Sequence, residues 1–233
     1  MVDHPPGFGP QGPARSASDY LLPPLSVILL GTALGAVALT HRVSARDERP
    51  LPSSTSGHMR AEARSEAGRR LSPVFRPEVL HWRDSIERWS AAAGVDPDLA
   101  GVVMQIESCG DPRAISRSGA LGLFQVMPFH FGSDENGLDP DTNAARALAY
   151  LGRSLEAAGG DARTALAGYN GGISVAQWDE AMWPEQTQRY VRYGWPLYED
   201  AMRGSVPSAA LEAWYYRYGV SLCRQAAARL GLP

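Results

Sequence analysis

Apolar residues recur at helical spacing through the last two thirds of the chain. The apolar positions between Val79 and Ala93 form one stripe, which Gly94 closes. A second stripe begins at the capping sequence Asp96-Pro97-Asp98 and ends at Glu107. The same criteria predict further helices over about residues 141–158, 162–167, 186–203 and 208–230. Residues 119–127 are apolar and rich in glycine, which predicts a buried turn or short strand within a mainly α-helical domain.

The first third of the chain has a different pattern. Residues 20–40 are 21 consecutive uncharged residues. At about 1.5 Å per residue, a helix of this length spans about 30 Å, the thickness of the apolar part of a bilayer. We therefore expect a membrane-spanning or signal helix over residues 20–40, a disordered leader over residues 1–19 and a flexible linker over residues 41–74. Residues 75–233 then form the folded domain with a C-terminal helical extension.

The role of residues 20–40 stays open at this point. Small residues at 36–38 and at 43–45 are candidate cleavage sites for a secretory signal. One arginine precedes the segment and three closely follow it, so the positive-inside rule alone places the downstream domain in the cytoplasm. A buried core helix fits less well, because the Pro-, Gly- and Ser-rich flanks offer no amphipathic partner.

Composition excludes several classes of function. The chain has 233 residues, of which 44% are hydrophobic and 20% charged, enough for one globular domain plus additional segments. Its 22 basic residues are all arginine, so no mechanism with a Schiff-base or P-loop lysine is available. Residues 75–233 carry 14 arginines and 19 acidic residues, which argues against nucleic-acid binding. Two cysteines exclude a four-cysteine zinc site, and no histidines recur at metal-ligand spacing.

Glu107 is the first candidate for chemistry. It ends a predicted apolar helix, where the negative end of the helix dipole and the loss of water both raise a carboxyl pKa. A carboxyl with a raised pKa suits a general acid that works near neutral pH. Taken alone, a glutamate at the end of a helix is more often a solvated surface residue.

Five sequence blocks in a fixed order change that interpretation. They are QIESCGDPRAIS at 105–116, GALGLFQVMP at 119–128, Asp139-Pro140 with Asn143 and Tyr150-Leu151, AGYNGG at 167–172, and PEQT at 184–187 with Tyr190-Val191. Together they resemble the soluble-type lytic transglycosylase (SLT) domain, a lysozyme-like family that cuts bacterial peptidoglycan. The resemblance covers about residues 90–192. It departs from the family at Gln186, where glutamate is usual, and within 167–172, where one residue is inserted or exchanged.

The resemblance implies roles for particular residues. Glu107 matches the single catalytic acid and base. The implied substrate-binding residues are Ser116, which matches a serine that orients the N-acetyl group of the sugar, and Gln125, Met127, Tyr169, Asn170 and Tyr190. Structural alternatives remain for several of these residues, because Gln125 and Asn170 can satisfy loop backbone, and Met127 and Tyr169 can pack in the core. No metal or cofactor is implied.

The implied reaction cleaves the β-1,4 bond between N-acetylmuramic acid and N-acetylglucosamine without water and gives a 1,6-anhydro product. One alternative is a hydrolysing muramidase, for which Asp134, Glu135, Asp139 and Asp141 are candidate second carboxylates, although Asp139 and Asp141 are also expected as turn and cap residues. The other is a catalytically silent wall-binding module, which the presence of Glu107 disfavours. We expect a monomer in the bacterial envelope outside the cytoplasm, secreted or membrane-anchored through residues 20–40, with peptidoglycan as its partner and no nucleic acid.

Cys109 and Cys223 admit two interpretations. They are either buried free thiols or a disulfide. An exported protein favours the disulfide, which ties the last predicted helix behind Glu107 and closes a loop of more than 100 residues.

Overall fold

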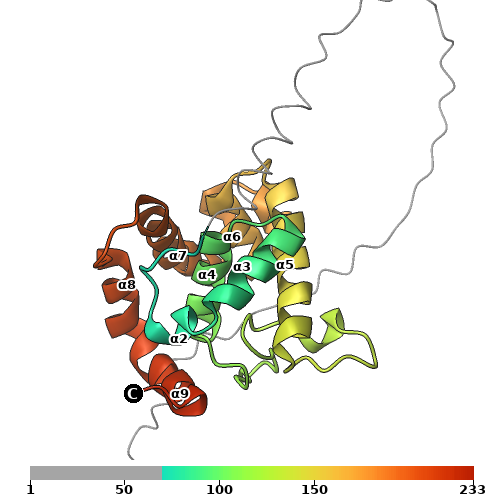
Figure 1. Ribbon diagram of the computed structural model, residues 1–233. Helices are drawn as coiled ribbons and strands as arrows, with labels where there is room; N and C mark the ends of the chain where they lie inside the picture. The colour runs from blue at the N-terminus through green and yellow to red at the C-terminus, as the bar shows by residue number, and fades with distance from the viewer. Residues whose placement is uncertain (1–69) are drawn as a thin grey trace, which may run out of the picture.

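The computed structural model describes residues 70–233, which form a bundle of helices joined by short loops (Figure 1). The elements are α2 (Pro77–Leu80), α3 (Arg83–Ala93), α4 (Pro97–Glu107), η2 (Pro128–His130), α5 (Pro140–Ala157), α6 (Ala162–Gly171), η3 (Ile173–Gln177), η4 (Glu180–Met182), α7 (Glu185–Arg203), α8 (Ala209–Trp214), η5 (Tyr215–Gly219) and α9 (Val220–Leu230). The mainly α-helical prediction is confirmed for this part of the chain. The segment 20–40 lies outside the described residues, and none of the helices within them has the length and apolar character that crossing a membrane requires.

Helix α4 is the centre of the core. Its residues from Pro97 to Ile106 are all buried, and it packs against α3 and α7. The helix begins where its sequence predicts, because the Asp96 carboxylate accepts hydrogen bonds from the backbone N–H groups of Asp98 and Leu99 at 2.8 and 3.4 Å. A helix that is apolar on all sides needs partners all round. The fold therefore holds Glu107 at the end of its most enclosed helix.

The folded region starts earlier than the composition indicates. Leu71 and Val74, which lie in the expected linker, are 2% and 5% exposed. They belong to the core together with Phe75, and the rings and methyl groups of Leu71 and Phe75 lie against the bare backbone of Gly101 in α4. Residues 71–74 are thus part of the packed domain.

The predicted helix over residues 79–93 is interrupted. Helix α2 ends at Leu80 and α3 begins at Arg83. At the break, the Trp82 indole N–H donates a hydrogen bond of 2.9 Å to the carbonyl oxygen of Gly110. Gly110 also passes so close to the Glu78 carbonyl that an added Cβ would lie 2.5 Å from that oxygen. The break lets this segment press against the loop that follows Glu107.

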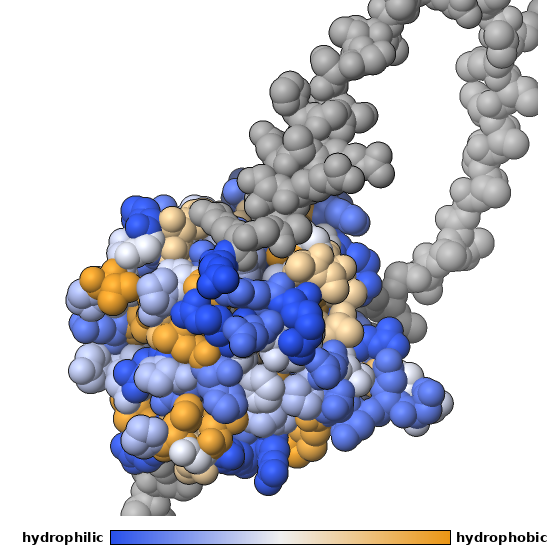
Figure 2. All heavy atoms as spheres, viewed as in Figure 1, coloured by the Kyte–Doolittle hydropathy of each residue, from blue (hydrophilic) through white to orange (hydrophobic). Residues whose placement is uncertain are grey.

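The predicted helix over residues 208–230 is also divided, into α8, a π-helical turn at Tyr215–Gly219 and α9. The wide turn accommodates the buried ring of Trp214, since an added Cβ on Gly219 would lie 2.6 Å from it. Helix α9 lies beside α2 at the lower end of the bundle in Figure 1. On the face shown in Figure 2, hydrophilic residues dominate and hydrophobic ones are scattered in separate groups.

Residues 119–127 form turns rather than a strand. Two isolated antiparallel bridges, Ile115 with Leu121 and Leu121 with Val126, fold this segment back on itself. The segment lies between the end of α4 and the start of α5 in the sequence. We refer to residues 119–127 as the GLFQ loop.

Candidate active site

Glu107 has the electrostatic character that its position in the sequence predicts. Burial raises the pKa of its carboxyl from 4.5 to about 8. The residue as a whole is nevertheless partly exposed. At neutral pH Glu107 is therefore mostly protonated and able to act as a general acid.

Two tyrosines from different helices lie near Glu107, Tyr190 buried and Tyr169 partly buried. Burial raises the pKa values of Tyr169 in α6 and Tyr190 in α7, and the nearby Glu107 charge raises both further. The Tyr190 hydroxyl meets no partner at ordinary hydrogen-bond geometry. It still lies close enough to the Glu107 carboxyl to lower that pKa, an effect smaller than that of burial. The contact between the Tyr190 hydroxyl and the Glu107 carboxyl is therefore weak, and the neutral hydroxyl can still donate a hydrogen bond to another group.

Tyr169 joins the helices to the GLFQ loop. Its hydroxyl donates a hydrogen bond of 2.8 Å to the carbonyl oxygen of Phe124, the residue before Gln125. The structure therefore brings together Glu107, Tyr169, Tyr190 and the backbone beside Gln125. These groups come from α4, α6, α7 and the loop, which are far apart in the sequence.

Asn143 is the main anchor of the GLFQ loop. Its Nδ2 donates to the carbonyl oxygens of Leu121 and Gly137 at 2.8 and 2.9 Å, and its Oδ1 accepts from the Phe124 N–H at 2.9 Å. Gly122 fits against this amide with a φ of +71°, and an added Cβ would lie 2.7 Å from Nδ2. From the other side, the Ser108 hydroxyl donates to the Leu123 carbonyl oxygen at 2.6 Å.

Gln125 has an unusual backbone conformation at the centre of the loop. Its φ is +51°, in the left-handed region that residues other than glycine rarely adopt. Its Nε2 donates to the carbonyl oxygens of Ala114 and Gly122 at 3.2 and 3.0 Å. Both amide hydrogens are thereby used, and the side chain is held in one orientation.

The remaining residues that the resemblance implies have mixed placements. Ser116 is buried, and its Oγ accepts a hydrogen bond of 2.9 Å from the Ala120 N–H. Asn170 accepts one of 3.1 Å from the Thr187 hydroxyl, which ties α6 to α7. Met127 is partly exposed and precedes η2. Their contacts with a substrate stay predictions.

Three of the four candidate second carboxylates have structural partners, namely Glu135, Asp139 and Asp141. Glu135 forms an ion pair with Arg146 at 2.6 Å, and Asp139 caps α5 through the Thr142 N–H at 2.9 Å. Asp141 accepts a hydrogen bond of 2.6 Å from the Trp89 indole N–H. The cap prediction is confirmed for Asp139, whereas Asp141 faces α3 instead.

The predicted disulfide between Cys109 and Cys223 is confirmed. A Glu78 carboxylate oxygen and the two sulfur atoms lie within 4.8 Å of one another. Because both sulfurs are bonded to each other, they offer no thiolate ligands for a metal ion.

A groove of about 390 Å³ lies between α3 and α5. It is lined by Trp89, Ala92, Ala93, Ala145, Leu148, Ala149, Gly152, Arg153 and Glu156. No residue that the sequence predicts for substrate binding lines it.

Sequence reasoning gave no role to several residues that build the site. Asn143 stands in a recognised block in the first turns of α5, but the contacts of its amide with the GLFQ loop leave no signal in the sequence. Ser108 and Asp111 flank the disulfide cysteine and gave no separate signal. Thr187 lies in another block, where its contact with Asn170 depends on how α6 and α7 pack.

Comparison with known proteins supports the family resemblance. Residues 84–188 match the family model described as the transglycosylase SLT domain, which confirms the resemblance. The transglycosylase of Enterobacteria phage PRD1 is 41% identical over 102 residues, which are 43% of this chain and 38% of the phage protein. The endo-type membrane-bound lytic murein transglycosylase A of Klebsiella pneumoniae (strain 342) is 41% identical over 68 residues, 27% of this chain and 34% of that protein. The Salmonella enteritidis protein of the same name is 42% identical over 62 residues, 27% of this chain and 30% of its own length. This chain therefore covers only 38%, 34% and 30% of the length of these three relatives.

Proposed function

We propose that this chain, in which residues 84–188 are a transglycosylase SLT domain, is a lysozyme-like lytic transglycosylase acting on bacterial peptidoglycan. The observation that carries the proposal is Glu107, a carboxyl with a pKa of about 8 at the end of a buried helix. The hydroxyls of Tyr169 and Tyr190 lie near this carboxyl, and backbone carbonyls hold the amide of Gln125 in the GLFQ loop.

One carboxyl can perform both proton transfers of this reaction. Protonated Glu107 donates its proton to the glycosidic oxygen between N-acetylmuramic acid and N-acetylglucosamine, and that bond breaks. The acetamido oxygen of the muramic acid residue attacks its own anomeric carbon and forms a cyclic cation. The Glu107 carboxylate then takes the proton from the C6 hydroxyl, whose oxygen attacks the anomeric carbon. The bond from that carbon to the acetamido oxygen breaks, which restores the acetamido group and closes a 1,6-anhydro ring. Glu107 returns to its protonated state, and no water is consumed.

The hydrolytic alternative requires a second carboxylate that acts as nucleophile or activates water. Glu135 and Asp139 are engaged with Arg146 and with the start of α5, and Asp141 with Trp89. These partners disfavour a free catalytic role for three of the four candidates and so support the single-carboxyl reaction.

The location follows from the substrate. Peptidoglycan lies outside the cytoplasmic membrane, and two of the relatives are named membrane-bound lytic murein transglycosylases. We propose a bacterial envelope location for this chain, with residues 20–40 as an anchor or signal. Protease accessibility on intact cells tests this orientation.

In the decisive experiment, the purified full chain is incubated with peptidoglycan and the masses of the products are measured by mass spectrometry. Products one water lighter than hydrolytic muropeptides support the proposal. Products with a free reducing end identify a muramidase instead, and intact glycan identifies a binding module. Glu107→Gln is the matched control, since it keeps the shape of the side chain and removes its acid function. Full activity in Glu107→Gln would disprove the assignment of the acid.

A further inference from the structure

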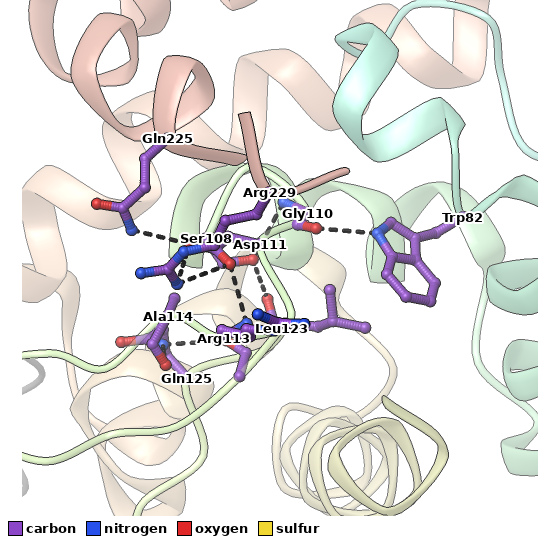
Figure 3. A network of polar contacts seen from close by, with 11 residues as sticks. Trp82, Ser108, Gly110, Asp111, Arg113, Ala114, Leu123, Gln125, Gln225 and Arg229 are labelled. Atoms are coloured by element: carbon purple, nitrogen blue, oxygen red, sulfur yellow. Dashed lines mark hydrogen bonds and ion pairs between the residues drawn. The ribbon is translucent and has the colours of Figure 1, made fainter. Parts of the chain in front are cut away.

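Helix α9 lies outside the part of the chain that matches the SLT domain, yet it is fastened to the loop that follows Glu107. Cys223 forms the disulfide with Cys109. The contacts of α9 with this loop do not end there, because two more of its side chains converge on Asp111, as Figure 3 shows.

Asp111 accepts the hydrogen bonds that these two side chains of α9 donate. Its side chain is fully buried, with 0% of its area exposed. The Arg229 Nη1 donates to both carboxylate oxygens of Asp111 at 2.8 and 3.0 Å, and the Gln225 Nε2 donates to Oδ2 at 2.8 Å. The Arg113 N–H donates to Oδ1 at 2.9 Å. A buried carboxylate with this many donors fixes both the turn that carries it and the helix that supplies them.

The turn at Asp111 leads directly to Gln125. The Ala114 N–H donates to the Asp111 carbonyl oxygen at 3.3 Å. The carbonyl oxygen of Ala114 in turn accepts from the Gln125 Nε2 at 3.2 Å and from the Gly122 N–H at 2.8 Å. The Ala114 carbonyl is therefore the point at which the position of Asp111 sets the orientation of the Gln125 amide (Figure 3).

We propose that Arg229 and Asp111 are positioning residues for Gln125, so that α9 sets the geometry of the substrate-binding loop from outside the family domain. This inference rests on the proposed function. Because the Gln125 Nε2 hydrogens are both donated to backbone carbonyls, Oε1 is the atom that Gln125 presents to a sugar hydroxyl or acetamido N–H. Gln125 holds a strained φ of +51°, and the contacts at Ala114 and Gly122 maintain it. Loss of the Arg229 contact releases the turn and lets Oε1 move away from the sugar.

The test is a double-mutant cycle in the full chain with the disulfide intact. The variants are Arg229→Gln, Gln125→Ala and the combination, and the measurement is kcat/KM for anhydro-product formation. We expect Arg229→Gln to lower kcat/KM by about 10- to 100-fold, the range that a displacement of about 1 Å produces. The combined variant should fall no further than Gln125→Ala alone, because both changes remove the same contact. Multiplicative losses would overturn the proposal, since they would mean that Arg229 acts independently of Gln125.

Two further variants separate positioning from folding. Arg229→Lys should recover part of the activity, because a single nitrogen atom makes both contacts with Asp111. Arg224→Gln, at an exposed position on the same helix, should leave kcat/KM unchanged. Circular dichroism and thiol titration establish that each variant is folded and oxidised. An equal loss in the Arg224 and Arg229 variants would contradict the specific role of Arg229.

A binding measurement distinguishes failure of this inference from failure of the proposed function. In the Glu107→Gln background, the Kd for a peptidoglycan tetrasaccharide should rise by a similar factor when Arg229→Gln is added. If the wild-type chain makes no anhydro product but this Kd still rises, the activity is wrong and the positioning role stands. If the wild type is active and neither kcat/KM nor Kd responds to Arg229→Gln, the positioning role is wrong.

Discussion

Replacement of Glu107 by glutamine should stabilise the folded chain, by an amount that grows with pH. The pKa of this carboxyl is about 8 in the folded protein and 4.5 in its ordinary environment, so the folded state holds the proton more tightly. The stabilisation that protonated Glu107 provides is fully present below about pH 4.5 and is lost as the pH rises to about 8. At about 1.36 kcal/mol per pH unit, this difference amounts to on the order of 5 kcal/mol. A glutamine side chain never ionises, so the Glu107→Gln variant does not lose this stability as the pH rises.

The assay is urea unfolding followed by circular dichroism, with the free energy of unfolding measured for both proteins between about pH 4 and pH 9. The difference should be near zero at the acidic end and reach several kcal/mol at the alkaline end. Other titrating groups are common to both proteins and cancel. Glu212→Gln, at an exposed position in α8, should change stability by no more than about 0.5 kcal/mol at any pH. A difference that does not vary with pH would refute the burial argument for Glu107.

Three other changes test the site. Because the Tyr190 hydroxyl lowers the pKa of Glu107, Tyr190→Phe should shift the alkaline limb of the kcat/KM profile, expected near pH 8 in the wild type, to higher pH; a shift to lower pH would contradict this. Serine at both Cys109 and Cys223 opens a cross-link of 114 residues and should lower the free energy of unfolding by about 4 to 5 kcal/mol on the chain-entropy model, measured by urea unfolding under oxidising conditions; stability equal to the wild type would contradict it. Asn143→Leu leaves backbone groups of Leu121, Gly137 and Phe124 without their partner, so it should lower the free energy of unfolding by at least about 2 kcal/mol and reduce anhydro-product formation. An unchanged Tm and rate would show that the GLFQ loop keeps its conformation without Asn143.

Local sequence patterns predicted the helices where the cause of the structure is itself local. Asp96 and Asp139 cap helices through N–H groups two or three residues away, so the signal and the contact lie in the same short segment. The break at Trp82 has a different cause, because its indole N–H donates to the carbonyl oxygen of Gly110, which lies beyond the next two helices in the sequence. The π-helical turn before α9 likewise depends on where the Trp214 ring lies. Periodicity cannot predict either feature.

The same distinction applies to the site. The sequence by itself determined the helical class and the position of Glu107 at the end of an apolar helix, and its ordered motifs led to the chemistry that we propose for this carboxyl. Only the tertiary structure placed Tyr169 and Tyr190 around that carboxyl and joined Arg229 to Asp111 across 118 positions of sequence. The physical reason is that a helix and its caps are set by neighbouring residues, whereas the burial that raises the Glu107 pKa and the contacts that orient Gln125 exist only once distant segments have packed together.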